Sequence, residues 1–326
     1  MDDRPRVLLV TSGDATEGRG HVSRTVTLAQ ALGAGASVAV SVLRGGLTPM
    51  DESRLAAAGA VRAPGLPEPA AFEIVVVDLP DPNESVGPCP AERLVVFDDG
   101  ARFRGAAAIV VQPSLPAWAG PGWADRVLAG AAVAPIRPEL RRLATDPPPA
   151  ADPPEVVVCF GGSDPFDVTS RLVPAVAGAV TATADPLRAS VVAIVGPGYR
   201  GRLAPDARWT ILRDPDDLDR RLATALLAVI GAGTMKLEVA HLGIPALLVA
   251  ASDDQLPVAA PFAATGAARY LGDGRTIDPG DVATAVSSLL ADDGTRRAMG
   301  EAGRAAVDGH GADRLATAIL RIAARP

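Results

Sequence analysis

Short apolar runs alternate along this chain with segments whose apolar residues recur every three to four positions. In the first half the runs span residues 7–10, 38–43, 74–77, 94–97 and 109–111. In the second half they span residues 156–160, 191–195, 209–212, 226–230 and 246–249. Because apolar residues occupy both faces of these runs, the runs are typical of buried parallel strands joined by helices. The sequence therefore predicts two consecutive α/β units.

A proline-rich segment separates the two halves. Five of the ten residues from Thr145 to Pro154 are prolines, which cannot continue a helix or join a central strand. We expect an N-terminal Rossmann-like domain over residues 1–146, a semi-rigid linker over 147–154 and a C-terminal Rossmann-like domain over 155–326. Ligands of open α/β sheets bind beyond the carboxyl ends of the strands, so the domains are expected to face each other across a ligand cleft.

Composition excludes several classes of function. The net charge of −7 and the absence of a Lys/Arg block argue against nucleic-acid binding. The two cysteines, Cys89 and Cys159, lie in unrelated contexts, which indicates reduced thiols rather than a metal site. The first residues have neither the apolar stretch nor the cleavage site expected of a signal peptide, and no apolar run is long enough to cross a bilayer. We therefore expect a cytoplasmic protein without a metal or another cofactor.

The turn from Gly18 to His21 carries the clearest chemical signal. It places an imidazole on a glycine-rich turn at a predicted helix start, where unpaired N–H groups and the helix dipole attract anions. This is a suitable place for a base beside a phosphorylated substrate, although a histidine here can also be a surface residue that caps the helix. Asp14 and Glu17 in the same loop are the alternative bases or substrate-orienting groups.

The second half contains two further glycine turns between a strand and a helix. One reads Phe-Gly-Gly-Ser-Asp-Pro over residues 160–165, and the other runs from Ile230 to Glu238. Glycines let the backbone approach a ligand, and Ser163 or Thr234 adds a hydroxyl donor, so a diphosphate would fit either loop. Glu238 lies one helical turn after Thr234, where it either accepts bonds from sugar hydroxyls or favours the helix dipole.

A set of motifs occurs in order along nearly the whole chain. They are Gly18-x-Gly20-His21-Val22-x-Arg24, Val77-Asp78, Phe97-Asp98-Asp99, Leu128-Ala129-Gly130, Ile136-Arg137-Pro138-Glu139, residues 160–165, Gly231-Ala232-Gly233-Thr234 with Glu238, Gly243-Ile244-Pro245 and Asp254-Gln255. Together they resemble the UDP-sugar hydrolase of pseudaminic acid biosynthesis and its relatives among spore-coat polysaccharide proteins. More distantly, the second half is similar to the MurG-type N-acetylglucosaminyltransferases.

The resemblance implies an α/β protein of the GT-B fold, whose two Rossmann-like domains face a central cleft. The second domain would hold most of the nucleotide, and the helix predicted over residues 313–323 would cross back to the first domain. His21 would be the base that activates water to attack the anomeric carbon, with UDP as the leaving group. The implied sugar-binding residues are Asp14, Gly18, Gly20, Asp254 and Gln255, and the implied nucleotide-binding residues are Gly161, Gly162, Ser163, Gly233, Thr234, Met235 and Glu238.

The chain departs from the family pattern at two charged positions. Asp254 stands where the family usually has Asn, which exchanges an amide donor for a carboxylate and indicates an altered sugar. Lys236 stands where the family tends to be uncharged; it either compensates Asp254, reaches a phosphate or is a solvated helix lysine.

The remaining acidic and histidine candidates are expected to be structural. Asp98 and Asp99 are adjacent on an extended segment and point in opposite directions, so we expect a strand-end turn cap rather than a metal clamp. His241 and His310 are expected to be structural or exposed.

Three functions from different classes fit the sequence. The main expectation is a nucleotide-sugar hydrolase, with UDP as the nucleotide. The alternative is an inverting glycosyltransferase that passes the sugar from the same donor to a small-molecule or polysaccharide acceptor. The third is a non-catalytic nucleotide-sugar-binding partner, which the presence of His21 argues against.

A nicotinamide dehydrogenase is excluded because the first turn lacks the third glycine and Leu43-Arg44, not an acid, ends the second strand.

Overall fold

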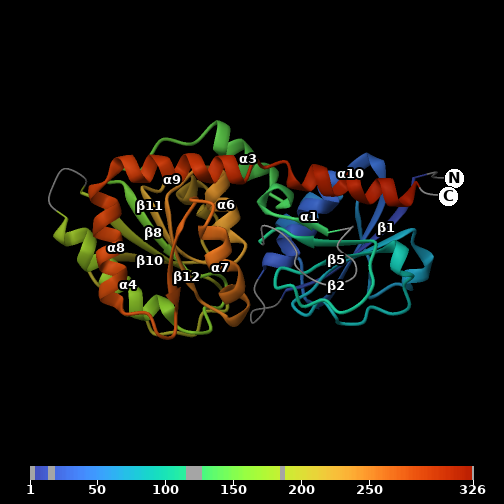
Figure 1. Ribbon diagram of the computed structural model, residues 1–326, viewed down its shortest axis with the longest axis horizontal. Helices are drawn as coiled ribbons and strands as arrows, with labels where there is room; N and C mark the ends of the chain where they lie inside the picture. Colours follow the sequence, from blue (N-terminus) through green and yellow to red (C-terminus); the bar gives the residue numbers. More distant parts are fainter. Residues whose placement is uncertain (1–3, 14–18, 115–126, 184–187, 325–326) are drawn as a thin grey trace. The chain divides into compact units, whose positions relative to one another are not determined.

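The computed structural model describes residues 4–13, 19–114, 127–183 and 188–324. The chain forms two compact units, one of residues 1–137 and 309–326 and the other of residues 138–308. Each unit contains one parallel β-sheet, and the main chain leaves the second unit to return to the first for its last helix (Figure 1).

The first unit is built on a seven-stranded sheet with the order β3-β2-β1-β4-β5-β6-β7. Its strands are β1 (Arg6–Gly13), β2 (Ser37–Gly45), β3 (Val61–Arg62), β4 (Ile74–Asp78), β5 (Leu94–Phe97), β6 (Ile109–Gln112) and β7 (Val127–Ala129). The central strand β1 pairs with β2 on one side and with β4 on the other, with Thr11 opposite Asp78. Because all the strands run parallel, the residues that end β1, β4, β5 and β6 lie at one edge of the sheet.

Helices cover one face of this first sheet. They are α1 (Gly20–Leu32), α2 (Pro49–Ala57) and α10 (Gly311–Ala323). Val22 and Val26 of α1 and Leu315 of α10 share a core cluster with the β-strand residues on that face. The opposite face is covered by loop residues, among them Leu79 and Phe103. The side chains of β1, β4, β5 and β6 are therefore buried on both faces, which explains their unbroken apolar runs.

The second unit has a six-stranded parallel sheet with the order β10-β9-β8-β11-β12-β13. Its strands are β8 (Glu155–Cys159), β9 (Ser190–Val195), β10 (Trp209–Arg213), β11 (Leu227–Gly231), β12 (Ala246–Ala250) and β13 (Arg269–Asp273). Its helices are α3 (Pro138–Thr145), α4 (Val168–Ala182), α5 (Leu218–Thr224), α6 (Met235–Leu242), α7 (Leu256–Ala263), α8 (Pro279–Ala291) and α9 (Asp293–Ala306). Helices α4 and α8 pack on one face of the sheet, and α6 packs against α9 (Figure 1).

The structure contains all ten strands that the apolar runs predict and three that they do not. The three are β3, β7 and β13, which are sheet-edge strands without a fully buried apolar run. The proline-rich segment connects α3 to β8 inside the second unit, because α3 packs on α5 and α6. The first of the two chain segments that form the first unit thus ends at Arg137 rather than at Asp146. Within the described residues, no helix is both long and apolar enough to span a membrane.

Gly311 is the first residue of α10, and it fits only because it lacks a side chain. A methyl group there would lie 2.2 Å from the carbonyl oxygen of Ala134. We therefore expect Gly311→Ala to lower the free energy of unfolding by about 1–3 kcal/mol, as overpacking does, in urea titrations followed by circular dichroism. Gly178→Ala is the matched control, since Gly178 is inside α4 with nothing within 4 Å of the added methyl. It should raise stability by about 0.5–1 kcal/mol. Equal effects of the two substitutions would contradict this explanation.

Candidate functional site

His21 occupies the second residue of α1 and faces the end of β4. Its Nδ1 lies 2.6 Å from Oδ1 of Asp78, and the imidazole is 22% exposed whereas the carboxylate is 2% exposed. A carboxylate oxygen can only accept, so this contact is a hydrogen bond when Nδ1 carries a proton, and in a neutral ring Nε2 is then the unprotonated nitrogen. Gly20 begins the same helix, whereas Asp14, Glu17 and Gly18 lie outside the described residues.

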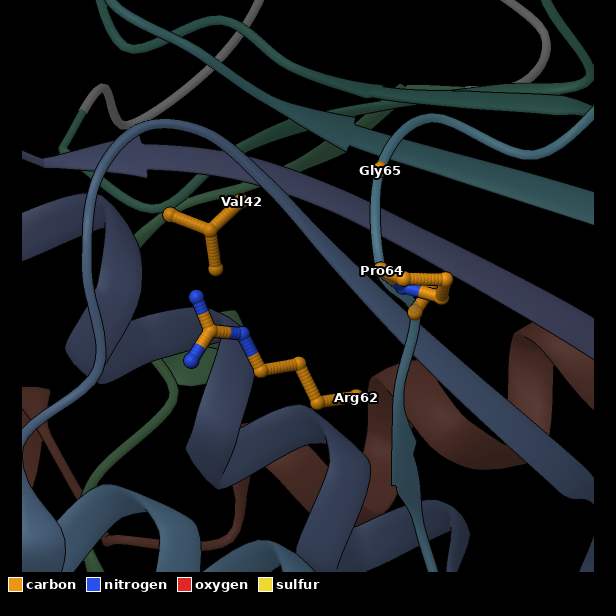
Figure 2. Close-up of a pocket in the computed structure, with 5 residues that line it drawn as sticks. Val42, Arg62, Pro64 and Gly65 are labelled. Atoms are coloured by element: carbon orange, nitrogen blue, oxygen red, sulfur yellow. The ribbon is translucent and has the colours of Figure 1, made fainter.

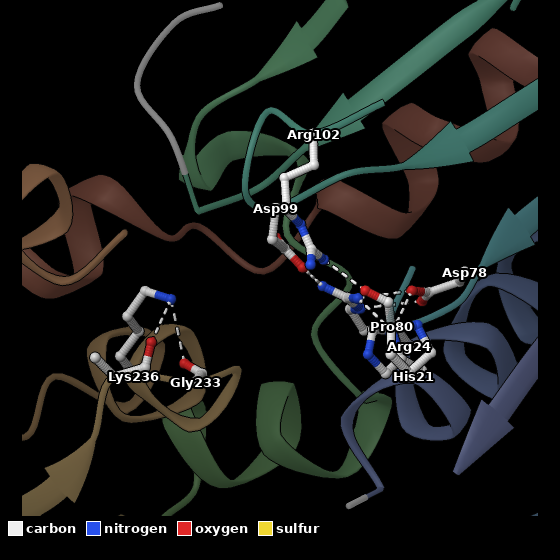
Figure 3. Close-up of polar contacts among 9 residues, drawn as sticks. His21, Arg24, Asp78, Pro80, Asp99, Arg102, Gly233 and Lys236 are labelled. Atoms are coloured by element: carbon white, nitrogen blue, oxygen red, sulfur yellow. Dashed lines mark hydrogen bonds and ion pairs between the residues drawn. The ribbon is translucent and has the colours of Figure 1, made fainter. Parts of the chain in front are cut away.

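Arg24 follows His21 by three residues and therefore shares its face of α1. The guanidinium of Arg24 donates from Nε to Asp78 Oδ2 at 3.0 Å and from its NH2 group to Asp78 Oδ1 at 2.6 Å. Its NH1 group bonds to Asp99 (Figure 3). The ring of Phe97 lies 5.2 Å from the guanidinium carbon. Burial by itself lowers the pKa of Arg24, but the carboxylates of Asp78 and Asp99 more than offset it, so the net shift is upward. Arg24 is thus a buried, permanently charged partner of two carboxylates.

The two adjacent acids after β5 have separate tasks, as their alternation predicts. Asp98 accepts hydrogen bonds from the backbone N–H groups of Arg102 and Phe103, both at 2.9 Å, and so caps the turn after the strand. Asp99 points to Arg24 instead. The expected turn cap is confirmed. Among the described residues, no group of three or more His, Cys, Asp or Glu side chains is arranged to hold a metal ion.

The sequence analysis missed the roles of Asp78, Arg24 and Asp99. The signal was present, because Asp78 ends the strand next to β1 and Arg24 lies one helical turn after His21. With one cation and two carboxylates around a neutral imidazole, the cluster has one net negative charge. A proton taken up by His21 would neutralise it, which suits the cluster to general-base chemistry.

In the second unit, the loop from Gly161 to Pro165 is held by its neighbours. Gly161 has a φ of +94°, which favours glycine. The backbone of Gly162 accepts a hydrogen bond from Gly198 at 2.9 Å, and a methyl group on Gly196 would lie 2.4 Å from the Gly162 Cα. These glycines therefore also have a packing role. Ser163 is half-buried in this loop.

Asp164 ends this loop by capping α4. Its two carboxylate oxygens accept hydrogen bonds from the N–H groups of Val168 at 2.9 Å and Thr169 at 2.8 Å. Burial raises the pKa of Asp164, and those two hydrogen bonds oppose the shift.

The second glycine loop, between β11 and α6, is fixed by two side chains. Gln255 Oε1 accepts from the backbone N–H groups of Ala232 at 2.7 Å and Ala251 at 3.0 Å. Lys236 is 2% exposed, and its Nζ donates to the carbonyl oxygens of Ala232 at 2.9 Å and Gly233 at 3.2 Å (Figure 3). The solvated-lysine interpretation is therefore wrong. Lys236 belongs to α6, so its two hydrogen bonds join this helix to the loop that precedes it.

The other predicted nucleotide-site residues lie at the start of α6. Gly233, Thr234 and Met235 supply the backbone N–H groups that precede the helical hydrogen-bond ladder, which begins with Lys236 and Leu237. Glu238 is half-buried in the first turn of α6. Asp254 is exposed in a short 3-10 helix, and its neighbour Asp253 forms an ion pair with Arg275 at 2.9 Å.

The other two histidines are structural or exposed, as expected. His241 is buried and its Nδ1 lies 2.9 Å from the carbonyl oxygen of Val307, whereas His310 is exposed and lies near Asp313. Both cysteines are free thiols. Burial raises the pKa of Cys159, which ends β8, to about 11.

A separate hollow of about 200 Å³ lies beside β2 and β3. It is lined by Val42, Arg62, Ala63, Pro64 and Gly65, and Figure 2 shows the Arg62 side chain extending toward Val42. The guanidinium of Arg62 is paired with Glu52 at 2.9 Å. None of the predicted site residues lines this hollow.

Comparison with solved structures defines the class of fold, which is GT-B. The calicheamicin glycosyltransferase CalG4 matches 99% of this chain and 99% of its own with a TM-score of 0.64 at 15% sequence identity. The spinosyn rhamnosyltransferase SpnG, complexed with thymidine diphosphate, covers 96% of this chain and 99% of its own with a TM-score of 0.60 at 18% identity. MurG of Acinetobacter baumannii covers 97% and 99% with a TM-score of 0.55 at 17% identity.

Among curated proteins, the chain is similar to the spore coat polysaccharide biosynthesis protein SpsG of Bacillus subtilis (strain 168). The two are 27% identical over 169 residues, which are 51% of this chain and 49% of SpsG. The match thus spans about half the length of this curated relative. The expected resemblance to SpsG-like proteins of the GT-B fold is confirmed. No protein-family model matches the chain.

The Gln255 contacts give a test of how the second loop is held. Gln255→Ala leaves two backbone N–H groups without their acceptor and should lower the free energy of unfolding by about 1–3 kcal/mol. Gln255→Glu keeps an acceptor oxygen at the same position and should retain most of that stability. Urea titrations of both variants measure the difference. An equal loss in the two variants would mean that these hydrogen bonds do not stabilise the loop.

Proposed function

We propose that the protein is a glycosyltransferase that transfers a sugar from a nucleoside diphosphate to an acceptor with inversion at the anomeric carbon. The observation that carries the proposal is the contact between His21 Nδ1 and Asp78, because it leaves Nε2 to take a proton. His21 is the general base, and Asp78 sets its tautomer.

The proposed reaction is a single displacement. His21 Nε2 removes the proton of an acceptor hydroxyl while that oxygen forms a bond to the anomeric carbon. The bond between the anomeric carbon and the diphosphate oxygen breaks, and the nucleoside diphosphate leaves with the electron pair. The imidazolium that forms neutralises the surplus negative charge of the cluster with Arg24, Asp78 and Asp99.

The second unit would bind the nucleotide. Its two glycine loops end at helix starts, whose N–H groups and dipole favour a diphosphate. Gly161, Gly162 and Ser163 would contact the donor from one loop, and Gly233, Thr234 and Met235 from the other. Glu238 would accept hydrogen bonds from ribose hydroxyls. Asp254, Gln255 and Gly20 are the proposed sugar-binding residues. Asp14 and Gly18 are also proposed to bind the sugar, and for these two the proposal rests on the sequence alone.

The choice of acceptor separates a transferase from the hydrolase that the motif resemblance favours. With water in place of the acceptor hydroxyl, the same base would perform hydrolysis. CalG4 and SpnG are both named as glycosyltransferases and match nearly the whole chain, which supports the transferase alternative over the hydrolase. UDP is the nucleotide that the motif resemblance implies, whereas the SpnG structure contains thymidine diphosphate. The experiment must therefore vary both the nucleotide and the acceptor.

A donor panel tests the proposed activity. The protein is incubated with UDP-, TDP-, GDP- and CMP-sugars, with and without cell extract as a source of acceptors, and nucleotide release is measured. We expect release that depends on the extract. Release in buffer alone would support a hydrolase, and nucleotide binding without turnover in either condition would support a non-catalytic partner protein.

Two substitutions test the proposed base. His21→Ala should lower kcat between about 10²- and 10⁴-fold, the usual contribution of a general base. Asp78→Asn should also lower kcat strongly, because an amide that donates to Nδ1 places the ring proton on Nε2. His310→Ala is the control, since His310 is exposed and outside the cluster, and should leave the rate unchanged. Full activity in His21→Ala would remove the assigned base.

A further inference from the structure

Arg24 contacts the groups around the proposed base from inside the protein. Its side chain is 3% exposed, and its NH2 group lies 2.6 Å from Asp78 Oδ1 and 3.0 Å from His21 Nδ1. The same carboxylate oxygen therefore accepts from both the guanidinium and the imidazole. Arg24 Nε donates to the other oxygen of Asp78, Oδ2, at 3.0 Å. The guanidinium therefore binds the carboxylate through two hydrogen bonds, a bidentate arrangement called the fork below.

We propose that Arg24 is a positioning residue that fixes the tautomer of His21 through Asp78. This inference rests on the proposed function of His21 as a base. Arg24 does not need to touch the substrate for this role. It holds the plane of the Asp78 carboxylate so that Oδ1 faces Nδ1, and its positive charge pairs with this buried carboxylate.

The orientation of Asp78 would be loose without the fork. The terminal torsion of an aspartate side chain has a broad energy minimum, so one hydrogen bond from the imidazole defines the carboxylate plane poorly. The guanidinium is itself held on three sides, by Asp78, by Asp99 and by the ring of Phe97. Arg24 thereby connects the end of β4 and the residues after β5 to the start of α1.

The charge of Arg24 matters as much as its geometry. A buried carboxylate is stable only when it is paired and hydrogen-bonded, and Arg24 donates two hydrogen bonds to Asp78. Without them the carboxylate can turn away from Nδ1, and the ring proton can then sit on Nε2. His21 would lose the lone pair that accepts the proton of the acceptor hydroxyl. Arg24 prevents this exchange because it holds the Asp78 carboxylate in place.

Asp99 limits the cost of placing a cation beside the ring. An imidazolium 3.0 Å from a guanidinium is repelled by it, and the carboxylates of Asp78 and Asp99 offset that repulsion. Asp99 is 27% exposed, whereas Asp78 is 2% exposed. The groups that face His21 and Arg24 are thus Asp78 from β4 and Asp99 after β5. The two carboxylates have different roles: Asp78 orients the imidazole ring of His21, and Asp99 balances the charge of Arg24.

The tautomer can be measured in the substrate-free protein. Nitrogen NMR of the histidine rings, assigned with His21→Ala, should show a proton on Nδ1 and none on Nε2 of His21 in the wild type. In Arg24→Gln the form protonated on Nε2 should become the major one. Arg24→Lys keeps the charge without the fork and should give a mixture of the two forms.

The control is Arg6→Gln. Arg6 also makes an ion pair with a carboxylate, Glu73 at 3.2 Å, but this pair is exposed and lies at the opposite end of β1 from the cluster. The Arg6→Gln variant should retain the wild-type tautomer. A folded Arg24→Gln protein that keeps the proton on Nδ1 would overturn the proposal. If Arg24→Gln does not fold, Arg24→Lys decides, and a wild-type tautomer in that variant would overturn the proposal in the same way.

Kinetics provide the second measurement. Arg24→Gln should lower kcat at least about tenfold with KM unchanged, because the residue acts on the base and does not contact the substrate. Arg24→Lys should recover part of the loss. A rise in KM with an unchanged kcat would contradict the positioning role. The NMR result does not require turnover, so a donor panel without activity would refute the proposed function and leave the tautomer assignment standing.

Discussion

The candidate site of the first unit depends on the hydrogen bonds that the carboxylate of Asp78 accepts. It is buried at the end of β4, where it accepts hydrogen bonds from His21 and from Arg24. A buried carboxylate is stable only when it is paired and hydrogen-bonded, and under the proposed function the same pairing would fix the tautomer of His21. Removing either α1 partner would leave a buried charge incompletely satisfied. A substitution of Asp78 is therefore expected to affect both the stability of the fold and the proposed reaction.

The parallel order of the strands explains why such a contact can form. Residues that end neighbouring strands meet at one edge of a sheet, and the helix that follows β1 begins at that same edge. The second unit uses the same geometry differently. There, Gln255 and the buried Lys236 hold the backbone of a loop, so the arrangement presents helix N–H groups rather than a titratable side chain. The same strand-turn-helix architecture thus presents a titratable side chain in one unit and backbone N–H groups in the other.

Local patterns predicted the elements but not all of their boundaries. Runs of buried valine, isoleucine and leucine located ten strands, because a strand covered on both faces needs apolar residues throughout. Short edge strands such as β3 carry no such run. The proline-rich segment was expected to divide the units, but α3 packs with the second unit and moves the division to Arg137. Proline marks where regular structure stops, whereas packing decides which unit a helix joins.

The sequence by itself determined the two parallel α/β units, the glycine turns at helix starts and the position of His21 in the first of them. These features depend on residues close together in the chain, such as an apolar run followed by glycines. Only the tertiary structure decided which partners His21 and Arg24 have. Asp78 is 57 residues from His21, and Asp99 is 75 residues from Arg24. No local pattern specifies such pairs, because strand order and helix packing bring them together.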